Sequence, residues 1–137
     1  MVTMLKNANT VLSQQPFSVL LGATITEFSS GHVTLELPIQ PQLLQQHGFV
    51  HGGVISYCAD NAMAFAAGST QSGQRVVTSE FKLNYTRPAV GEKIVARAQV
   101  IHAGKTQIIC RCDIFAVQND QEKLCAAGQG TIAVVKG

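Results

Sequence analysis

The chain has 137 residues, a length that suits one domain, and we expect a single domain over residues 1–137. Hydrophobic residues make up 46% and charged residues only 13%, a balance that excludes a disordered chain. The net charge of +2 is too small for an ordinary nucleic-acid-binding face, so no nucleic-acid partner is expected. So low a charge density favours burial of apolar surface against another subunit.

The cysteines and the apolar runs indicate where the protein works. No apolar run reaches the roughly 18 residues that cross a bilayer, and the first 15 residues lack the apolar core of a signal peptide. Cys58, Cys110, Cys112 and Cys125 contain no C-x-x-C pair. We therefore predict reduced core thiols in a cytoplasmic protein that does not associate with membranes.

The first half of the chain predicts a short helix, two strands and a long helix. The short helix is predicted at residues 3–14 and ends before Pro16. Strands are predicted at 22–28 and 32–39, because apolar and polar residues alternate in the second run and Ser-Ser-Gly separates the two. Residues 52–67 are too long for a strand and predict a helix closed by Gly68. This helix is apolar on nearly every side, so burial on nearly every side is expected.

Four further strands follow, at residues 75–88, 91–105, 106–117 and 123–137. In the first of them Val77, Ser79 and Phe81 alternate with Thr78 and Glu80, which predicts two opposite faces. The short connections favour antiparallel neighbours. The fold class is therefore predicted to be α+β, an antiparallel sheet of about six strands with one long helix between the second and third strands.

Asp60 is the unusual residue of the long helix. It is the only acid between Glu36 and Glu80, and it lies among apolar side chains. An ionised carboxylate there is costly unless it has a partner. A hydrogen-bond donor in a neighbouring element would satisfy it without any function, and burial alone supports that interpretation as well as a functional one.

The start of the same helix supplies a second feature. His51-Gly52-Gly53 begins an apolar helix whose first backbone N–H groups have no partner inside the helix. Such an electropositive end can hold an oxyanion or polarise a carbonyl, and glycines allow a ligand to approach closely. A tight connection from strand to helix would explain the glycines equally well.

Together the two features suggest acyl transfer, with a carbonyl held at the helix start and a carboxylate acting on it. Gly52 and Asp60 are eight residues apart, which is about 12 Å along one helix. Asp60 cannot reach a carbonyl held at its own helix start. If both act on one carbonyl, they come from different copies of the chain, so this hypothesis predicts a two-fold dimer.

Other polar residues support weaker hypotheses. His47 and His51 have the i, i+4 spacing of a metal pair, but Gly48 argues against a helix there and no third ligand follows, so no metal is expected. His51 could be a general base, although its place before the glycines better suits a positioning role. Ser56 has no obvious histidine partner, and Cys58 lies in the apolar run and is expected to be inert.

The basic residues are concentrated in the second half of the chain. Residues 1–74 carry one base and three acids, whereas residues 75–137 carry nine bases and five acids. A few of these bases could bind a small polyanion such as a nucleotide-bearing group. Taken alone, the pattern fits solvent-exposed strand faces better.

The stretch GFVHGGVISYCADNAMAFAA, residues 48–67, resembles the HGG-x6-D motif of the hotdog-fold acyl-CoA thioesterases of the PaaI-like (phenylacetate-degradation) family. The likeness continues through LLGATITEF before the helix and NYTRPAVGEKIVARAQVIHAGKT after it. It implies a sheet wrapped around a central helix, in homodimers whose sheets join edge to edge and often pair into tetramers. It implies hydrolysis of acyl-CoA thioesters, with CoA as part of the substrate and no separate cofactor.

The resemblance also implies roles for particular residues. Asp60 matches the catalytic carboxylate, either nucleophile or general base, and Gly52 the backbone N–H that polarises the thioester carbonyl. His51 helps to shape that site, Thr78 lies near the attacking water, and Gln45 replaces an asparagine that the family often has. The residues expected to bind substrate are Gln46, Gly53, Asn61, Phe81, Asn84, Arg87, Pro88, Gly104 and Lys105, of which the last five match the region near the CoA nucleotide.

We therefore expect a thioesterase for small aryl- or medium-chain acyl-CoA. Its acyl pocket is predicted to be lined by Phe49, Val50, Tyr57, Met63 and Phe81. One alternative is an acyl-CoA-binding hotdog domain without catalysis. Another is a structural dimerisation module in which Asp60 is merely satisfied by a neighbour.

Overall fold

Six strands and three α-helices make up the chain in the computed structural model, which describes residues 2–136. In chain order the elements are α1 (Val2–Leu12), α2 (Pro16–Leu21), β1 (Thr24–Ser29), β2 (His32–Pro38), the 3-10 turn η1 (Pro41–Leu43), α3 (Gly52–Gly68), β3 (Arg75–Tyr85), β4 (Lys93–Ala103), β5 (Gln107–Gln118) and β6 (Gln121–Val135). The predicted sheet of six strands, with a long helix between the second and third, is confirmed.

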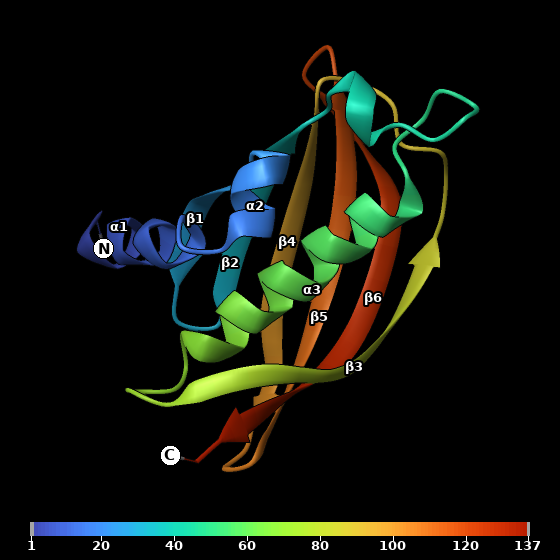
Figure 1. Cartoon of the computed structure of the whole chain (residues 1–137). Coiled ribbons are helices and arrows are strands. Elements are labelled where there is room, and N and C mark those ends of the chain that lie inside the picture. Colours follow the sequence, from blue (N-terminus) through green and yellow to red (C-terminus); the bar gives the residue numbers. More distant parts are fainter. Residues whose placement is uncertain (1, 137) are drawn as a thin grey trace.

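The strands lie in the order β1-β2-β4-β5-β6-β3, and each neighbouring pair is antiparallel. The long α3 carries the chain across the sheet, so β3 pairs with the last strand rather than with β2 (Figure 1). The two edges of the sheet are therefore β1 and β3.

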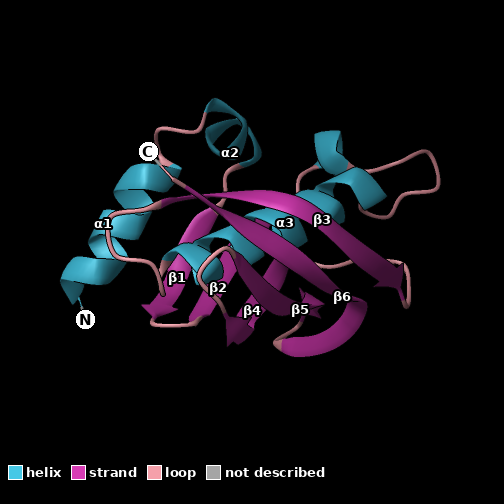
Figure 2. Ribbon diagram, turned by 90° about the horizontal axis from the view of Figure 1, so that it is seen from below, coloured by secondary structure: helices cyan, strands magenta, loops and turns pink. Residues whose placement is uncertain are grey.

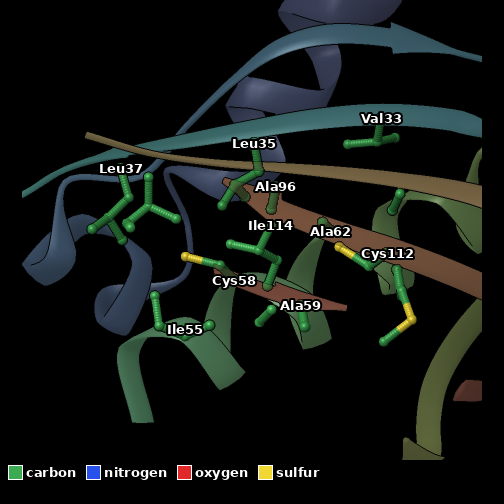
Figure 3. Packing of buried hydrophobic residues seen from close by; sticks show 14 of the residues in the cluster. Val33, Leu35, Leu37, Ile55, Cys58, Ala59, Ala62, Ala96, Cys112 and Ile114 are labelled. Carbon is green, nitrogen blue, oxygen red and sulfur yellow. The ribbon is translucent and has the colours of Figure 1, made fainter. Parts of the chain in front are cut away.

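The sheet curls around α3, and α1 lies beside the edge strand β1 (Figure 2). The helix turns Ile55, Cys58, Ala62 and Ala66 toward the strands at three- and four-residue spacing, and none is more than 2% exposed. Strand residues such as Leu35 meet them in one apolar cluster (Figure 3). Small side chains on α3 let the helix lie close to the sheet.

The other side of α3 is only half-buried. Val54, Tyr57, Asn61 and Phe65 all keep part of their surface accessible. The prediction of burial on nearly every side was therefore wrong for a single chain, because strands cover the helix on one side only.

The N-terminal region differs from its prediction in one element. The first helix ends at Leu12, and a second helix, α2, follows it. Pro16 occupies the first turn of α2, where its missing N–H costs nothing, and Gly22 ends it with a left-handed φ of 82°. None of the helices within residues 2–136 is both long and apolar enough to cross a membrane.

A β-bulge changes the side of the sheet to which the side chains of β3 point. Thr78 pairs with Ile132 and Glu80 with Thr131, so Ser79 has no residue opposite it in β6. Thr78 and Phe81 are consequently both half-buried, whereas Val77 is 54% exposed. The predicted alternation, which put Val77 on the face of Phe81, was wrong ahead of the bulge.

Candidate active site

The start of α3 presents one free backbone donor. His51 is the N-cap residue, and its Nδ1 accepts a hydrogen bond of 2.8 Å from the Gly53 N–H. The Val54 N–H donates to the carbonyl oxygen of His51 at 3.0 Å. Within residues 2–136 the Gly52 N–H has no hydrogen-bond partner. This N–H can therefore donate to a ligand at the electropositive end of the helix.

Tyr85 lies close against residue 52. Its hydroxyl donates to the Gly52 carbonyl oxygen at 2.8 Å. A Cβ added at Gly52 would lie 3.2 Å from that hydroxyl oxygen and 3.3 Å from the ring. Sequence reasoning missed Tyr85, because no local pattern signals a contact between residues 33 positions apart.

Asp60 has a specific partner on the edge strand. The Thr78 hydroxyl donates to Asp60 Oδ1 at 2.7 Å, and the bulge in β3 is what turns Thr78 toward the helix. Asp60 is only half-buried, and its second oxygen accepts no hydrogen bond from the part of the chain described. The carboxylate is thus oriented through one oxygen, while the other remains able to accept a proton or to attack.

The two features do not meet within one chain. Gly52 and Asp60 lie on one uninterrupted helix, so they are separated by about 12 Å of rise. Tyr85 and Thr78 hold these two points of the helix to the two ends of β3. β3 is an edge strand, so the half-site at each end of it borders the open side of the sheet.

Asn61, next to Asp60, belongs to a polar cluster with α2. Its amide donates to Gln15 Oε1 at 3.1 Å and to the Tyr57 hydroxyl at 3.0 Å. The Tyr57 hydroxyl donates to the buried Ser18 at 2.5 Å, and burial raises the pKa of Tyr57. The ring of Phe17 meets Tyr57 edge-on at 5.3 Å. The cluster joins α2 to α3 and fixes the side chain beside Asp60.

The loop before α3 is organised by its own backbone. The Gln45 side-chain oxygen accepts from the backbone N–H of His47, and the Gln45 N–H donates to the Phe49 carbonyl oxygen at 2.9 Å. Gln46 and His47 are exposed, and His47 stacks with Phe49. Residues 2–136 contain no group of three or more His, Cys, Asp or Glu side chains that could hold a metal.

The predicted substrate-binding residues are spread over three places. Arg87 and Pro88 line a cavity of about 340 Å³ beside Gly52, together with Phe49 and Val50. Asn84 lines a hollow with Arg111 on the sheet face that points away from α3. Gly104 and Lys105 lie in the β4–β5 turn, at the opposite end of the sheet from Arg87. One chain alone does not bring these groups together.

Two residues of the predicted acyl pocket lie elsewhere. Met63 is fully buried in the core between α3 and β5, where its carbonyl oxygen meets the thiol of Cys110. Phe81 is half-buried on the inner face of β3 and packs against that core. Neither lines the cavity beside Gly52, and their place in an acyl pocket stays a prediction.

The cysteine thiols are unsuited to nucleophilic attack. All four are unpaired and buried, as predicted. Burial raises the pKa of Cys58 and Cys112 strongly, and that of Cys110 and Cys125 to about 11. The thiols therefore stay protonated near neutral pH.

The same fold occurs in known proteins. The family model described as "Thioesterase superfamily" matches residues 47–123. A thioesterase family protein from Silicibacter pomeroyi superposes with a TM-score of 0.92 at 34% identity, over 95% of this chain and 96% of that one. A thioesterase from Haemophilus influenzae superposes with a TM-score of 0.85 at 27% identity, over 96% and 90% of the two chains. "Acyl-coenzyme A thioesterase PaaI" of Escherichia coli is 29% identical over 126 residues, which are 91% of this chain and 86% of that one.

Proposed function

This chain belongs to the Thioesterase superfamily and has its hotdog fold, and we propose that it hydrolyses the thioester bond of an acyl-CoA at sites shared between two copies. The relative from Escherichia coli, named as an acyl-coenzyme A thioesterase, supports this substrate class. The proposal rests on two features of one helix. The Gly52 N–H is free to donate to a ligand, and the Asp60 carboxylate is oriented by a hydrogen bond from Thr78, about 12 Å away along the helix.

The open edge of β3 offers a way to unite the two half-sites. Two β3 strands that pair antiparallel around a two-fold axis place the Thr78 end of one against the Tyr85 end of the other. The axis then passes near Phe81 and Lys82, midway between Thr78 and Tyr85. Asp60 of one chain thereby approaches Gly52 of its partner, and the dimer holds two equivalent sites. Pairing of such dimers into tetramers remains a prediction.

In this proposal the Gly52 N–H binds the thioester carbonyl oxygen, which carries the negative charge of the tetrahedral intermediate. Asp60 of the other chain either takes a proton from water as the water attacks the carbonyl carbon, or attacks the carbon itself. The C–S bond then breaks and CoA leaves as the thiol. In the first route the proton held by Asp60 passes to sulfur. In the second, CoA leaves first as the thiolate, and hydrolysis of the acyl-aspartyl anhydride by water restores the Asp60 carboxylate and supplies the proton that converts the thiolate to the thiol. Neither route requires a cofactor.

The surrounding residues have supporting roles in the proposal. Thr78 orients Asp60, and His51 fixes the first turn of α3 by accepting from Gly53. Gln45 shapes the loop beside the helix start. Arg87 and Pro88 lie next to Gly52, where they can contact the CoA moiety, and in the dimer Lys105 comes to the same side from the other chain. The unpaired, buried cysteines fit a reducing compartment such as the cytoplasm.

Replacement of Asp60 by Asn tests the proposal. The amide keeps the shape and can still meet Thr78, but it can neither accept the proton nor attack. We expect thiol release from medium-chain acyl-CoAs or phenylacetyl-CoA to fall by at least about 100-fold, with an unchanged circular dichroism spectrum and melting temperature. Turnover by the variant within a few-fold of the parent protein would refute the assigned role.

A further inference from the structure

A cavity of about 510 Å³ lies between α1 and α3. Its apolar walls come from Met4 and Val11 on α1, Ala64 and Phe65 on α3, and Val76 on β3. The volume falls within the range of roughly 300–1,000 Å³ that is usual for small-molecule sites. Its described lining comes from one chain, and Val76 is the one lining residue that lies on β3, the strand of the proposed two-fold contact.

The cavity adjoins the Asp60 half-site. Asn61, the residue after Asp60, lies on its wall, and Ala64 follows Asp60 by one helical turn on the same side of α3. On the edge strand, Val76 precedes Thr78 by two residues and faces the same way. A group attached to a carbonyl carbon at Asp60 can therefore pass directly into the cavity.

The chemistry of the lining differs from that near Gly52. Among the described residues that line the α1–α3 cavity, the polar ones carry amides or hydroxyls and none is charged. The cavity beside Gly52 instead includes Arg87. An uncharged, largely apolar cavity suits a hydrocarbon chain or ring, whereas a cationic one suits a phosphate-bearing group.

We propose that the acyl group of the substrate occupies the α1–α3 cavity of the chain that supplies Asp60, with α1 as the wall that limits its length. The CoA portion then lies over the Gly52 end of the partner chain. This inference rests on the proposed function. It also accounts for the surface position of Val11, an apolar residue that is 51% exposed at the cavity.

Two variants fill the cavity from opposite walls. Ala64→Leu narrows it close to Asp60, and Val11→Trp narrows it from α1. Thr10→Trp is the matched control, because Thr10 is exposed on the same helix but does not line this cavity. We expect kcat/KM for octanoyl-CoA relative to acetyl-CoA to fall at least about tenfold in both filling variants. The control should keep the ratio of the parent protein.

A binding measurement separates this inference from the proposed function. S-octyl-CoA and S-methyl-CoA are thioethers that cannot be hydrolysed, so calorimetry measures their Kd whether or not the protein is a catalyst. The filling variants should weaken S-octyl-CoA binding at least about tenfold more than S-methyl-CoA binding. Equal effects on both ligands, or a folded Ala64→Leu protein that keeps the octyl preference, would overturn the inference. Loss of turnover in Asp60→Asn would still support hydrolysis in that case.

Discussion

The two edge strands of the sheet differ in whether another part of the chain covers them. At β1, the side-chain amide of Asn9 on α1 donates to the Ile25 carbonyl oxygen at 2.8 Å and accepts from the Ile25 N–H at 2.9 Å. One side chain thus takes the place of a neighbouring strand. At β3, an edge strand of eleven residues has β6 as its one neighbouring strand in the described chain. An uncovered edge of this length favours pairing with another strand, which is why the proposed dimer joins two copies at β3.

Of the changes that test this comparison, a proline placed in one edge strand or the other should have the largest effect. Ser79 and Thr26 are both bulge residues without an opposite partner in the neighbouring strand. Proline is tolerated at such positions, but it removes the N–H and blocks the outer edge. We expect Ser79→Pro to give a monomer in analytical ultracentrifugation and to lose at least about 100-fold in thiol release, because the half-sites separate.

Thr26→Pro is the control for that experiment. It introduces the same residue at the equivalent kind of position on the edge that α1 already covers, so dimer and activity should persist. A Ser79→Pro protein that stays dimeric would place the contact elsewhere than at β3.

Alkaline pH should destabilise the central strands of the sheet, which lie between the two edge strands. Burial raises the pKa of Cys110 and Cys125 from 9.0 to about 11, so the folded protein favours the neutral thiol. The contribution of each thiol to the free energy of unfolding is fully present below pH 9 and is lost as the pH rises from about 9 through about 11. We expect urea unfolding at pH 10 to show a loss of about 1 kcal/mol per thiol relative to pH 8. A flat profile between these pH values would contradict the effect.

Removal of the amide that covers β1 should have the smallest effect. Asn9→Ala leaves the Ile25 N–H and carbonyl without their partner, and water can replace part of what is lost. We expect a decrease of about 1 kcal/mol in the free energy of unfolding, with unchanged turnover. Asn7→Ala on the same helix is the control for stability, since Asn7 makes no side-chain hydrogen bond within residues 2–136. Equal stability of the two variants would show that Asn9 does not cover the edge.

Much of the fold could be predicted from the sequence, because its signals are local. Alternation in residues 32–39 and the length of the apolar run at 52–67 identified β2 and α3. The missed α2 also had local signals, a proline at its start and a glycine at its end, but six residues are too few to show helical periodicity.

The candidate site was harder to predict, because it depends on contacts between distant segments. The motif identified Asp60 and the helix start, and the helix rise separated them. The bulge that turns Thr78 inward leaves no trace in the sequence, since Val77, Ser79 and Phe81 alternate as in a regular strand. The contact between Tyr85 and Gly52, like the cover that Asn9 provides for β1, exists only once the chain has folded.

The straight path of α3 between Gly52 and Asp60 has a consequence for how much active protein a solution contains. In the proposal, one chain contains every group that the reaction needs, but its own helix holds the Gly52 N–H and the Asp60 carboxylate about 12 Å apart. Activity per chain then depends on total concentration. Dilution below the dimer dissociation constant should therefore abolish activity at both sites at once.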